Sequence, residues 1–355
     1  MFQPRRWAKR LSLAVGLVAS AGLLLFLGAQ NSGAQDADGT KFPPQIEAPL
    51  GLPEIEWPED NDYSPEKAEL GWYLYYDARL SKDGTLACAT CHSPAFSFTD
   101  GAPVSTGIAG QTGERSAPVV FNQVFNHEQF WDGRAPSLEA QAVSAIANPI
   151  EMGFTHQAMV ARLNELGGYG DMFDAAFGSP DITIDNVAKA IATFERTLLS
   201  GDSAYDRYQA GDLAAMNGAQ INGMRIFQGK ANCDACHGGP NFTYNTYHNL
   251  GVGMGRSDPD LGRSVVTKAA GDTGAFKTPT LREISKTAPY MHDGSLKTLE
   301  EVVAFYNVGG FANEHRDRRM MPLGLTPKEQ ADLVAFLRAL DGTTLNTKRP
   351  EKFPQ

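Results

Sequence analysis

Apolar residues recur with the period of an α-helix in several separate segments of this chain. The clearest set shares one helix face at spacings of three or four residues: Val187, Ile191, Phe194 and Leu198. Helical patterns also occur in residues 137–146 and 155–166. A further helix is predicted for residues 65–76, because Ser64 suits the N-cap and a proline takes the first helical position.

The second half of the chain repeats parts of this plan. Residues 71–75 (Gly-Trp-Tyr-Leu-Tyr) are echoed by residues 223–227 (Gly-Met-Arg-Ile-Phe), and each lies shortly before a Cys-x-x-Cys-His sequence. Capping boxes at residues 298–301 and 326–329 precede two more apolar helical runs. Strand signals are few and short. The pattern predicts a mainly α fold in two similar halves.

Segments without helical periodicity suggest the domain limits. Residues 35–61 are rich in proline, glycine and acidic residues, and they are interpreted as a solvated linker. Residues 80–118 are punctuated by glycine and proline, and residues 200–212 are rich in turn-forming residues. We therefore expect an N-terminal domain over residues 62–205 and a C-terminal domain over residues 206–345.

The first 34 residues have the character of an export signal. A basic start is followed by an apolar run over residues 11–29 and then by the small residues Ser32, Gly33 and Ala34. The run is also long enough to span a bilayer, so the segment is either cleaved or kept as a membrane anchor. Either outcome places the folded part outside the cytoplasm, in the periplasm. The net charge of −10 argues against a nucleic-acid partner.

All four cysteines belong to two Cys-x-x-Cys-His motifs, whose residues are Cys88, Cys91 and His92, and Cys233, Cys236 and His237. Two thiols at this spacing can attach to the vinyl groups of one haem, and the following histidine can bind the iron. A zinc site would have no use for a histidine directly after each pair. A redox disulfide would need one pair only. The motifs thus predict two covalent haem c groups, with His92 and His237 as iron ligands.

The remaining histidines and several methionines are further candidate ligands. For any one of these side chains, an ordinary surface or core role is the commoner outcome. The candidates are His127, His156, His248, His292 and His315, and Met254, Met291, Met320 and Met321.

Four further motifs accompany the haem motifs: Ala117–Asn122 (APVVFN), Phe130–Ala135 (FWDGRA), Asn148–Met152 (NPIEM) and Thr287–Gly294 (TAPYMHDG). With them, residues 62–342 resemble the bacterial dihaem cytochrome c peroxidases, a superfamily that includes the MauG-type enzymes. The resemblance implies two cytochrome c-like domains, each with one covalent haem. It also implies that peroxide reacts at the first haem and that the second transfers electrons.

The resemblance extends to individual residues. Trp131 matches the tryptophan that lies between the haems in the family, where a large indole can shorten the electron-tunnelling gap; the alternative is a buried structural aromatic. Glu151 and Gln141 match the residues above the first haem. A carboxylate there can move a proton from one peroxide oxygen to the other, and a neutral amide can orient the peroxide.

Two departures from ordinary peroxidases shape the functional prediction. Many of these enzymes close the first haem with a histidine, but residues 104–115 contain none, and Ile108 stands at about the matching place. We therefore expect an open, five-coordinate first haem. The usual methionine ligand of the second haem is replaced by Tyr306, as in MauG-type enzymes. If Tyr306 is instead an ordinary helix residue, Met320 or Met321 would be the ligand.

The family also holds calcium between its haems. Thr287 and Pro289 match the backbone carbonyl ligands, and Ser116 stands where the family often has an asparagine.

Three functions remain open at this stage. The first is reduction of hydrogen peroxide with electrons from a small cytochrome c or a cupredoxin. The second is MauG-like oxidation of a side chain in a protein substrate. The third is a dihaem electron carrier without enzymatic activity.

Overall fold

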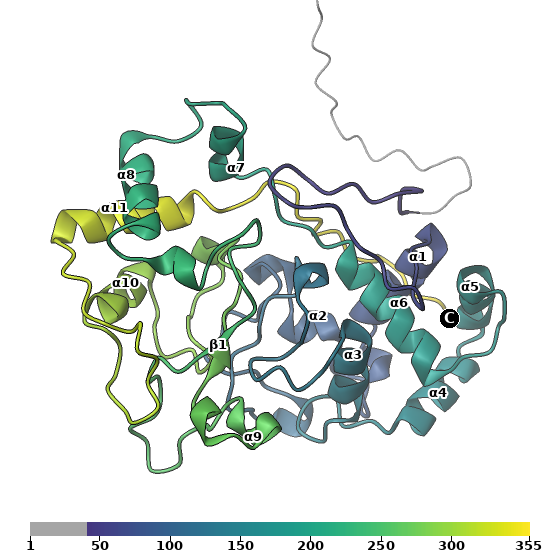
Figure 1. Ribbon diagram of the computed structural model, residues 1–355. Coiled ribbons are helices and arrows are strands. Elements are labelled where there is room, and N and C mark those ends of the chain that lie inside the picture. Colours follow the sequence, from purple (N-terminus) through teal and green to yellow (C-terminus); the bar gives the residue numbers. More distant parts are fainter. Residues whose placement is uncertain (1–40) are drawn as a thin grey trace, which may run out of the picture. The chain divides into compact units, whose positions relative to one another are not determined.

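The computed structural model describes residues 41–355, and its regular structure is almost entirely helical (Figure 1). In this range the helices are α1 Pro65–Tyr76, α2 Cys88–Cys91, α3 Leu138–Ala147, α4 His156–Glu165, α5 Gly167–Phe177, α6 Ile184–Arg196, α7 Ala204–Gln209, α8 Gly218–Gln228, α9 Ser264–Thr267, α10 Leu299–Asn307 and α11 Pro327–Arg338. Two short strands, β1 Tyr247–His248 and β2 Phe276–Lys277, pair antiparallel. The predicted mainly α fold is confirmed.

The segment predicted to be an export signal or anchor, residues 1–34, lies outside the described residues. Across residues 41–355 the structure contains no helix long and apolar enough to cross a membrane.

Most predicted helix ends agree with the structure. The Ser64 side chain accepts a hydrogen bond from the Lys67 backbone amide at the start of α1. Both predicted capping boxes, at α10 and α11, are formed. Within the turn-rich residues 200–212 the structure contains a short helix, α7. Its capping box, Ser203 with Asp206, is a start signal that the turn-rich composition concealed.

Gly71 and Gly223, which occupy corresponding positions of the repeated sequence, allow the same close helix contact in each half. A Cβ atom at Gly71 of α1 would lie 1.9 Å from the carbonyl oxygen of Ala190 in α6. A Cβ atom at Gly223 of α8 would lie 1.9 Å from the carbonyl oxygen of Asp332 in α11. Only glycine lets the two backbones approach so closely. The repeat in sequence is therefore a repeat in packing.

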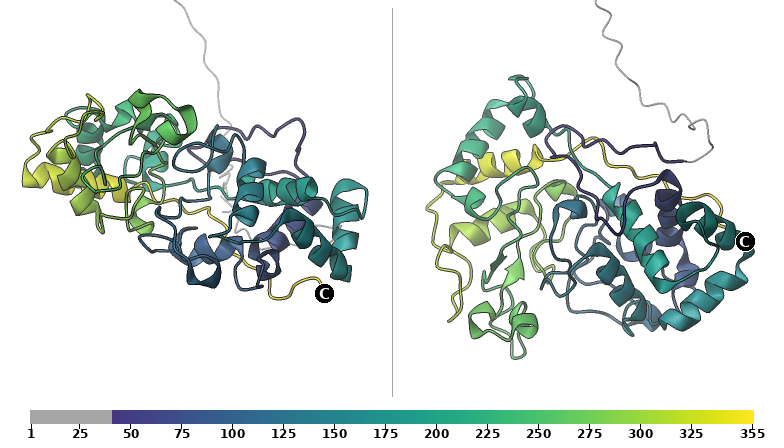
Figure 2. Two further views of the ribbon diagram at one scale, coloured as in Figure 1. Left: turned by 90° about the horizontal axis from the view of Figure 1, so that it is seen from below. Right: turned by 45° about the vertical axis from the view of Figure 1, so that its right-hand side comes forward.

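Each helix pair belongs to a separate hydrophobic core. The first cluster gathers side chains from α1 and α3–α6, and the second gathers side chains from α8, α10 and α11. The helices of the two clusters lie on opposite sides of Figure 1, and they remain apart in both views of Figure 2.

The segment expected to be a solvated linker contributes to the fold. As predicted, residues 41–61 contain no helix or strand. However, Phe42 is buried and packs edge-on against Trp72 and Phe194, and Asn61 is buried as well. The expectation that the whole segment is solvated is therefore corrected: Phe42 packs on the first core, and the Gly51 carbonyl accepts a 3.0 Å hydrogen bond from Arg282.

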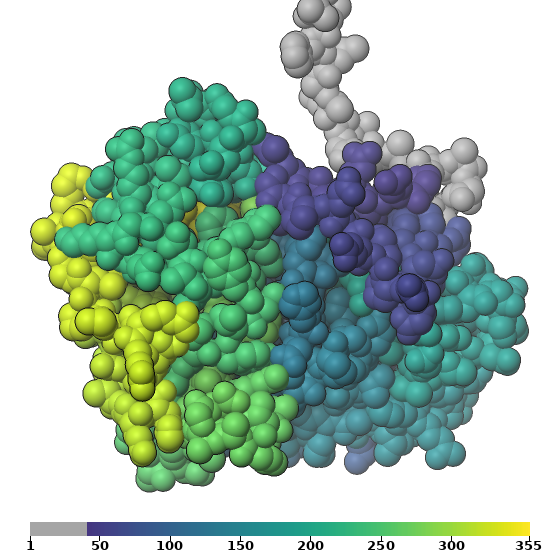
Figure 3. Space-filling view, in the orientation of Figure 1, coloured from purple at the N-terminus to yellow at the C-terminus, as the bar shows by residue number. Residues whose placement is uncertain are grey.

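The chain end also returns to the first half. The Trp72 indole donates a 3.0 Å hydrogen bond to the Lys348 carbonyl, and Arg79 donates to the Pro354 carbonyl at 2.8 Å. The space-filling view shows the green and yellow second half directly against the blue part of the first half (Figure 3). The two cores are thus parts of one continuous assembly of residues 41–355, and the surfaces that face each other can build a shared site.

Candidate functional site

Both Cys-x-x-Cys-His motifs open into one cavity of about 1020 Å³. Its lining includes every residue that the sequence singled out for haem attachment, for catalysis or for calcium: Cys88, Cys91, His92, Gln141, Glu151, Trp131, Cys233, Cys236, His237, Thr287, Pro289 and Tyr306. A pocket for one drug-sized ligand has a volume of about 300–1,000 Å³, and this cavity lies just above that range. The two halves therefore enclose room for large groups close to each other.

The two motif histidines are oriented in the same way. Nδ1 of His92 lies 3.3 Å from the carbonyl oxygen of Phe98, and Nδ1 of His237 lies 3.1 Å from that of Phe242. Both phenylalanines have positive φ angles, 59° and 52°, which are uncommon for a non-glycine residue. The left-handed backbone turns each carbonyl toward the imidazole. Nδ1 is thereby engaged, and Nε2 is left for iron.

The protonation state of these histidines suits iron binding. Burial lowers the pKa of His92, and the carbonyls of Phe98 and Pro118 offset this only in part. Burial likewise lowers the pKa of His237 to about 4, against the opposing effect of the Phe242 and Pro279 carbonyls. Both imidazoles are neutral at pH 7, which is the form that binds a metal.

These features together fit two covalent haem groups. The four cysteines are free thiols rather than disulfides, so all of them remain able to form thioethers. In each half, two thiols and one neutral imidazole reach the cavity from a single short segment. This is the donor set that a c-type haem requires.

Gln141 and Glu151 come from α3 and the loop that follows it. The loop is fixed because the Glu151 amide donates to the Asn148 carbonyl at 3.0 Å and the Glu151 carbonyl accepts from the Ile108 amide at 2.8 Å. Burial raises the pKa of the Glu151 carboxyl, and Arg134 and Asn148 offset part of this rise. Within residues 41–355 the side-chain amide of Gln141 has no hydrogen-bond partner. Both side chains are thus available to a ligand in the cavity.

Ile108 is not part of the cavity wall. Its side chain packs beside Gly153, where a Cβ atom would lie 3.2 Å from the isoleucine Cγ2. Four histidines of the chain line the cavity: His92, His237, His248 and His292. None comes from residues 104–115, which contain no histidine.

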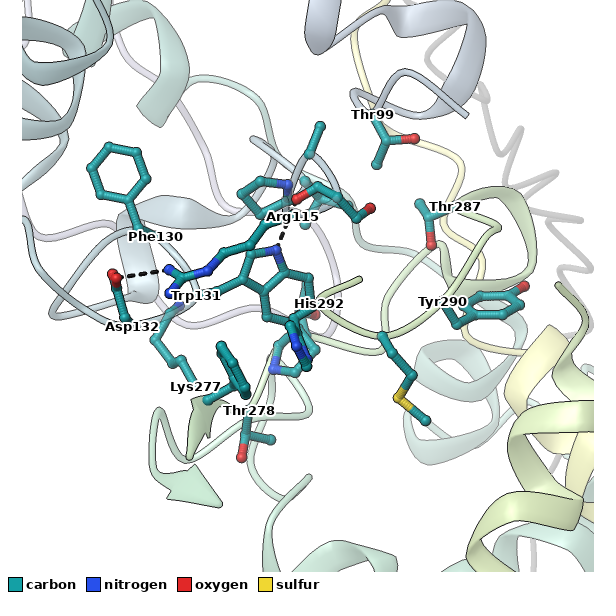
Figure 4. A pocket seen from close by; sticks show the side chains of 18 of the residues that line it. Thr99, Arg115, Phe130, Trp131, Asp132, Lys277, Thr278, Thr287, Tyr290 and His292 are labelled. Carbon is teal, nitrogen blue, oxygen red and sulfur yellow. Dashed lines mark hydrogen bonds and ion pairs between the residues drawn. The ribbon is translucent and has the colours of Figure 1, made fainter. Parts of the chain in front are cut away.

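Trp131 lies in the cavity wall and is held through both its indole and its backbone (Figure 4). Its indole Nε1 donates to the Ser116 carbonyl at 2.9 Å, and its own carbonyl accepts from the Lys277 amide at 2.7 Å. His292 stacks on Phe276 with ring centroids 3.6 Å apart and an interplanar angle of 14°. The indole is therefore a rigid part of the cavity wall and not a loosely packed aromatic.

Three side chains that were proposed as ligands of the second haem reach the cavity: Tyr306 on α10, and Met320 and Met321 on the loop before α11. The Tyr306 hydroxyl forms no hydrogen bond to any residue in the described part of the chain. Burial raises the pKa of Tyr306, and the thiols of Cys233 and Cys236 add to this. A tyrosine enclosed without a partner, close to the second motif, is suited to bind iron there.

Ser116, Thr287 and Pro289 also share the cavity wall. Nowhere in residues 41–355 do three or more His, Cys, Asp or Glu side chains form a group that could hold a metal ion. The oxygens that Ser116, Thr287 and Pro289 have for a calcium ion are hydroxyl and backbone carbonyl oxygens.

Two charged residues of the cavity had no signal in the sequence. Lys277 belongs to β2, and Glu195 lies next to the apolar stripe of α6. Each is less than a tenth exposed. An isolated charge beside apolar residues usually indicates a solvent-facing position, so only the tertiary structure reveals their burial.

Comparisons with known proteins find matches over most of this chain. Residues 65–214 match the family described as di-haem cytochrome c peroxidase, and residues 220–341 match cytochrome c. The cytochrome-c peroxidase IdrP1 of Denitromonas iodatirespirans is 37% identical to this chain, over 93% of this chain and 95% of the relative. The methylamine utilization protein MauG of Methylophilus methylotrophus is 38% identical, over 87% of this chain and 90% of that protein.

A solved structure is similar as well. A MauG-like protein associated with microbial copper homeostasis superposes with a TM-score of 0.77 and 34% identity, covering 83% of this chain and 95% of that protein. The predicted pair of cytochrome c-like domains is confirmed.

Proposed function

This chain belongs to the di-haem cytochrome c peroxidase family, and we propose that it reduces hydrogen peroxide to water with electrons from an external redox protein. The supporting observation is that Glu151, Gln141 and His92 line the same cavity. An electron carrier needs an enclosed haem and has no use for a free carboxyl and a free amide beside it. A peroxidase needs both.

The proposed catalytic residues divide the chemistry between them. A haem held by Cys88, Cys91 and His92 supplies an iron at which the peroxide O–O bond can break. The Glu151 carboxylate takes the proton from one peroxide oxygen and delivers it to the other, which leaves as water. The Gln141 amide holds the peroxide by a hydrogen bond. Two electrons and two protons are consumed for each peroxide, and two water molecules form.

The proposed coordination rests on the sequence and on the residues of the cavity wall. Because residues 104–115 contain no histidine, the first haem is proposed to be five-coordinate and open in the resting enzyme. The second haem, attached to Cys233 and Cys236, has His237 and Tyr306 as its ligands. Trp131 carries electrons between the two. If the diferric protein as isolated contained only low-spin haem, the proposed open site would be wrong.

The test is the turnover of reduced cytochrome c with peroxide by the holoenzyme. We expect the Glu151→Gln variant, which keeps the shape of the side chain but removes the base, to lose 10²–10⁴-fold in kcat/KM. The control is Glu165→Gln, which removes an exposed carboxylate from the same half. Full activity of Glu151→Gln with normal haem content would exclude this role for the carboxylate.

A second candidate function is oxidation of a side chain in a protein substrate. Tyr306 favours it, because a phenolate stabilises oxidised iron and suits the second haem to sharing an oxidising equivalent. The discriminating experiment mixes the diferric protein with stoichiometric peroxide and then adds reduced cytochrome c. Rapid reoxidation of the cytochrome supports the peroxidase. A long-lived oxidised state of the protein that does not react with the reduced cytochrome supports oxidation of a protein side chain.

The proposed partners and location follow from this chemistry. The electron donor is a small cytochrome c or a cupredoxin. The location is the periplasm, because haem c is attached outside the bacterial cytoplasm, and the N-terminal segment either is removed or anchors the protein to the membrane. Calcium is proposed to bind the carbonyls of Thr287 and Pro289. Metal analysis after gel filtration should then find one calcium for each chain, and its absence would exclude the site.

A further inference from the structure

Lys277 differs from every other basic residue of the cavity wall. Six basic side chains line the cavity, and five of them form ion pairs with carboxylates: Arg115 with Asp132 and Asp260, Arg134 with Asp132, Lys230 with Glu329, Arg282 with Asp206, and Arg319 with Asp317. The Lys277 ammonium group forms neither a hydrogen bond nor an ion pair with any residue in the described range 41–355. Lys277 is nevertheless buried, with only 8% of its surface exposed.

An enclosed ammonium group without a partner is costly to the fold. Burial lowers the pKa of Lys277 to about 8, and the more distant Glu128 counteracts this only in part. Glu128 is already engaged, since it forms an ion pair with Arg263 at 3.0 Å and accepts a hydrogen bond from the Tyr247 hydroxyl. The protein itself thus offers Lys277 no free carboxylate, and the open direction is the cavity.

The backbone around Lys277 is fixed on the side of the second motif. Its amide is bound to the Trp131 carbonyl, and the next residue, Thr278, accepts a 2.6 Å hydrogen bond from the Thr243 hydroxyl through its carbonyl. The carbonyl of Pro279, two residues on, faces His237 and raises its pKa. Figure 4 shows Lys277 beside Trp131 in the cavity wall. The backbone of Lys277 is therefore held at Trp131, two residues before a carbonyl that faces the second haem motif.

We propose that Lys277 binds a propionate carboxylate of the haem attached to Cys233 and Cys236. A haem carries two propionates, and an enclosed carboxylate needs a cation as much as Lys277 needs an anion. The contact compensates both charges at once. It also fixes that edge of the haem next to the indole of Trp131, and the positive charge favours the ferrous state of the haem. The inference rests on the haem attachment in the proposed function, but not on the reaction with peroxide.

The test is an optical redox titration of the holoprotein, in which the two haems are followed by their separate absorption bands. The variant is Lys277→Met, because methionine has a similar length and no charge. At a given potential, the ratio of ferric to ferrous second haem should be about tenfold higher in this variant. This corresponds to a fall of about 59 mV in its midpoint potential. The first haem should keep its potential, and Lys277→Arg should keep both. Lys297→Met, at an exposed lysine, is the control for net charge.

The outcomes separate this inference from the proposed function. Unchanged potentials for both haems in Lys277→Met, with two haems bound, would overturn it, and so would a shift confined to the first haem. If Lys277→Met and Lys277→Gln both lose the second haem while Lys277→Arg retains it, the cation is needed to hold that haem, and the inference stands. Loss of both haems in all three variants would indicate a role in folding instead. Failure of haem attachment in the unmodified protein would refute the proposed function itself.

Discussion

The backbone amide of Lys277 donates a 2.7 Å hydrogen bond to the carbonyl oxygen of Trp131. This contact joins the two halves of the chain at an aromatic residue of the cavity wall. The opposite end of Trp131 is held by the Ser116 carbonyl, and the Ser116 amide in turn donates to the His292 carbonyl at 2.7 Å. The position of the indole is thus determined by residues of both halves.

A Trp131→Phe variant should therefore lose electron transfer more than it loses structure. Phenylalanine is smaller, harder to oxidise and unable to donate to the Ser116 carbonyl, and losing this bond costs about 1 kcal/mol of stability. We expect at least a tenfold slower peroxide turnover, measured by stopped-flow, with haem content and spectra unchanged. Trp57→Phe, a substitution outside the cavity wall, is the control. Equal rates in the two variants would contradict a relay through Trp131.

The shared glycine contact gives a prediction about stability. In Gly71→Ala the added methyl group would overlap the Ala190 carbonyl, so α1 and α6 must move apart. We expect a loss of about 2 kcal/mol in the free energy of unfolding, and the same loss in Gly223→Ala. Gly170 in α5 has nothing within 4 Å of its Cβ direction, and alanine there should stabilise by about 0.5–1 kcal/mol. If denaturant unfolding gave Gly71→Ala and Gly170→Ala the same change in the free energy of unfolding, the close contact would be disproved.

The sequence predicted those elements that carry their own local signals. Capping side chains mark the starts of α1, α10 and α11, and the periodic apolar residues of α6 mark its buried stripe. Helix α5 gave no such signal, because its first turn contains glycines and its N-cap position, Leu166, has no side chain able to cap. Its place depends instead on packing against α1.

The candidate site also contains features that the sequence predicted and features that it did not. The haem motifs are contiguous in the sequence, so their chemistry follows from spacing alone. The burial of Glu195 could not be predicted from the sequence. Glu195 directly follows Phe194 of the apolar stripe, and a helix position next to such a stripe is usually exposed. Glu195 is buried because α6 is covered by both α1 and α3, which is a property of the assembled core.

The ligand of the second haem can be tested by single substitutions. Tyr306→Phe removes only the hydroxyl, which has no other partner in the described residues, so the fold should not change. We expect the absorption and electron paramagnetic resonance signals of the second haem alone to change. Met320→Leu is the matched control at the same cavity wall. An unchanged spectrum in Tyr306→Phe together with a changed one in Met320→Leu would identify the methionine as the ligand.

Glu195 gives the clearest prediction for pH dependence. The Oε2 atom of this carboxyl is buried without a hydrogen-bond partner. Burial raises its pKa to about 8, Glu139 adds to the rise, and Arg196 opposes it. In the unfolded chain the group would ionise near its ordinary pKa of about 4.3. Between these two values the folded state binds more protons than the unfolded state, so the stability of the protein should fall as pH rises.

Glu195→Gln removes this dependence, because the amide stays neutral at every pH. The free energies of unfolding of the variant and the original holoprotein should be similar at pH 5. They should diverge up to pH 9, where the variant is more stable by up to about 5 kcal/mol. Chemical unfolding at several pH values measures this, with Glu165→Gln, at an exposed carboxylate, as the control. If the two stability curves ran parallel from pH 5 to pH 9, Glu195 would already be ionised in the folded protein, stabilised by a positive charge within the loaded cavity.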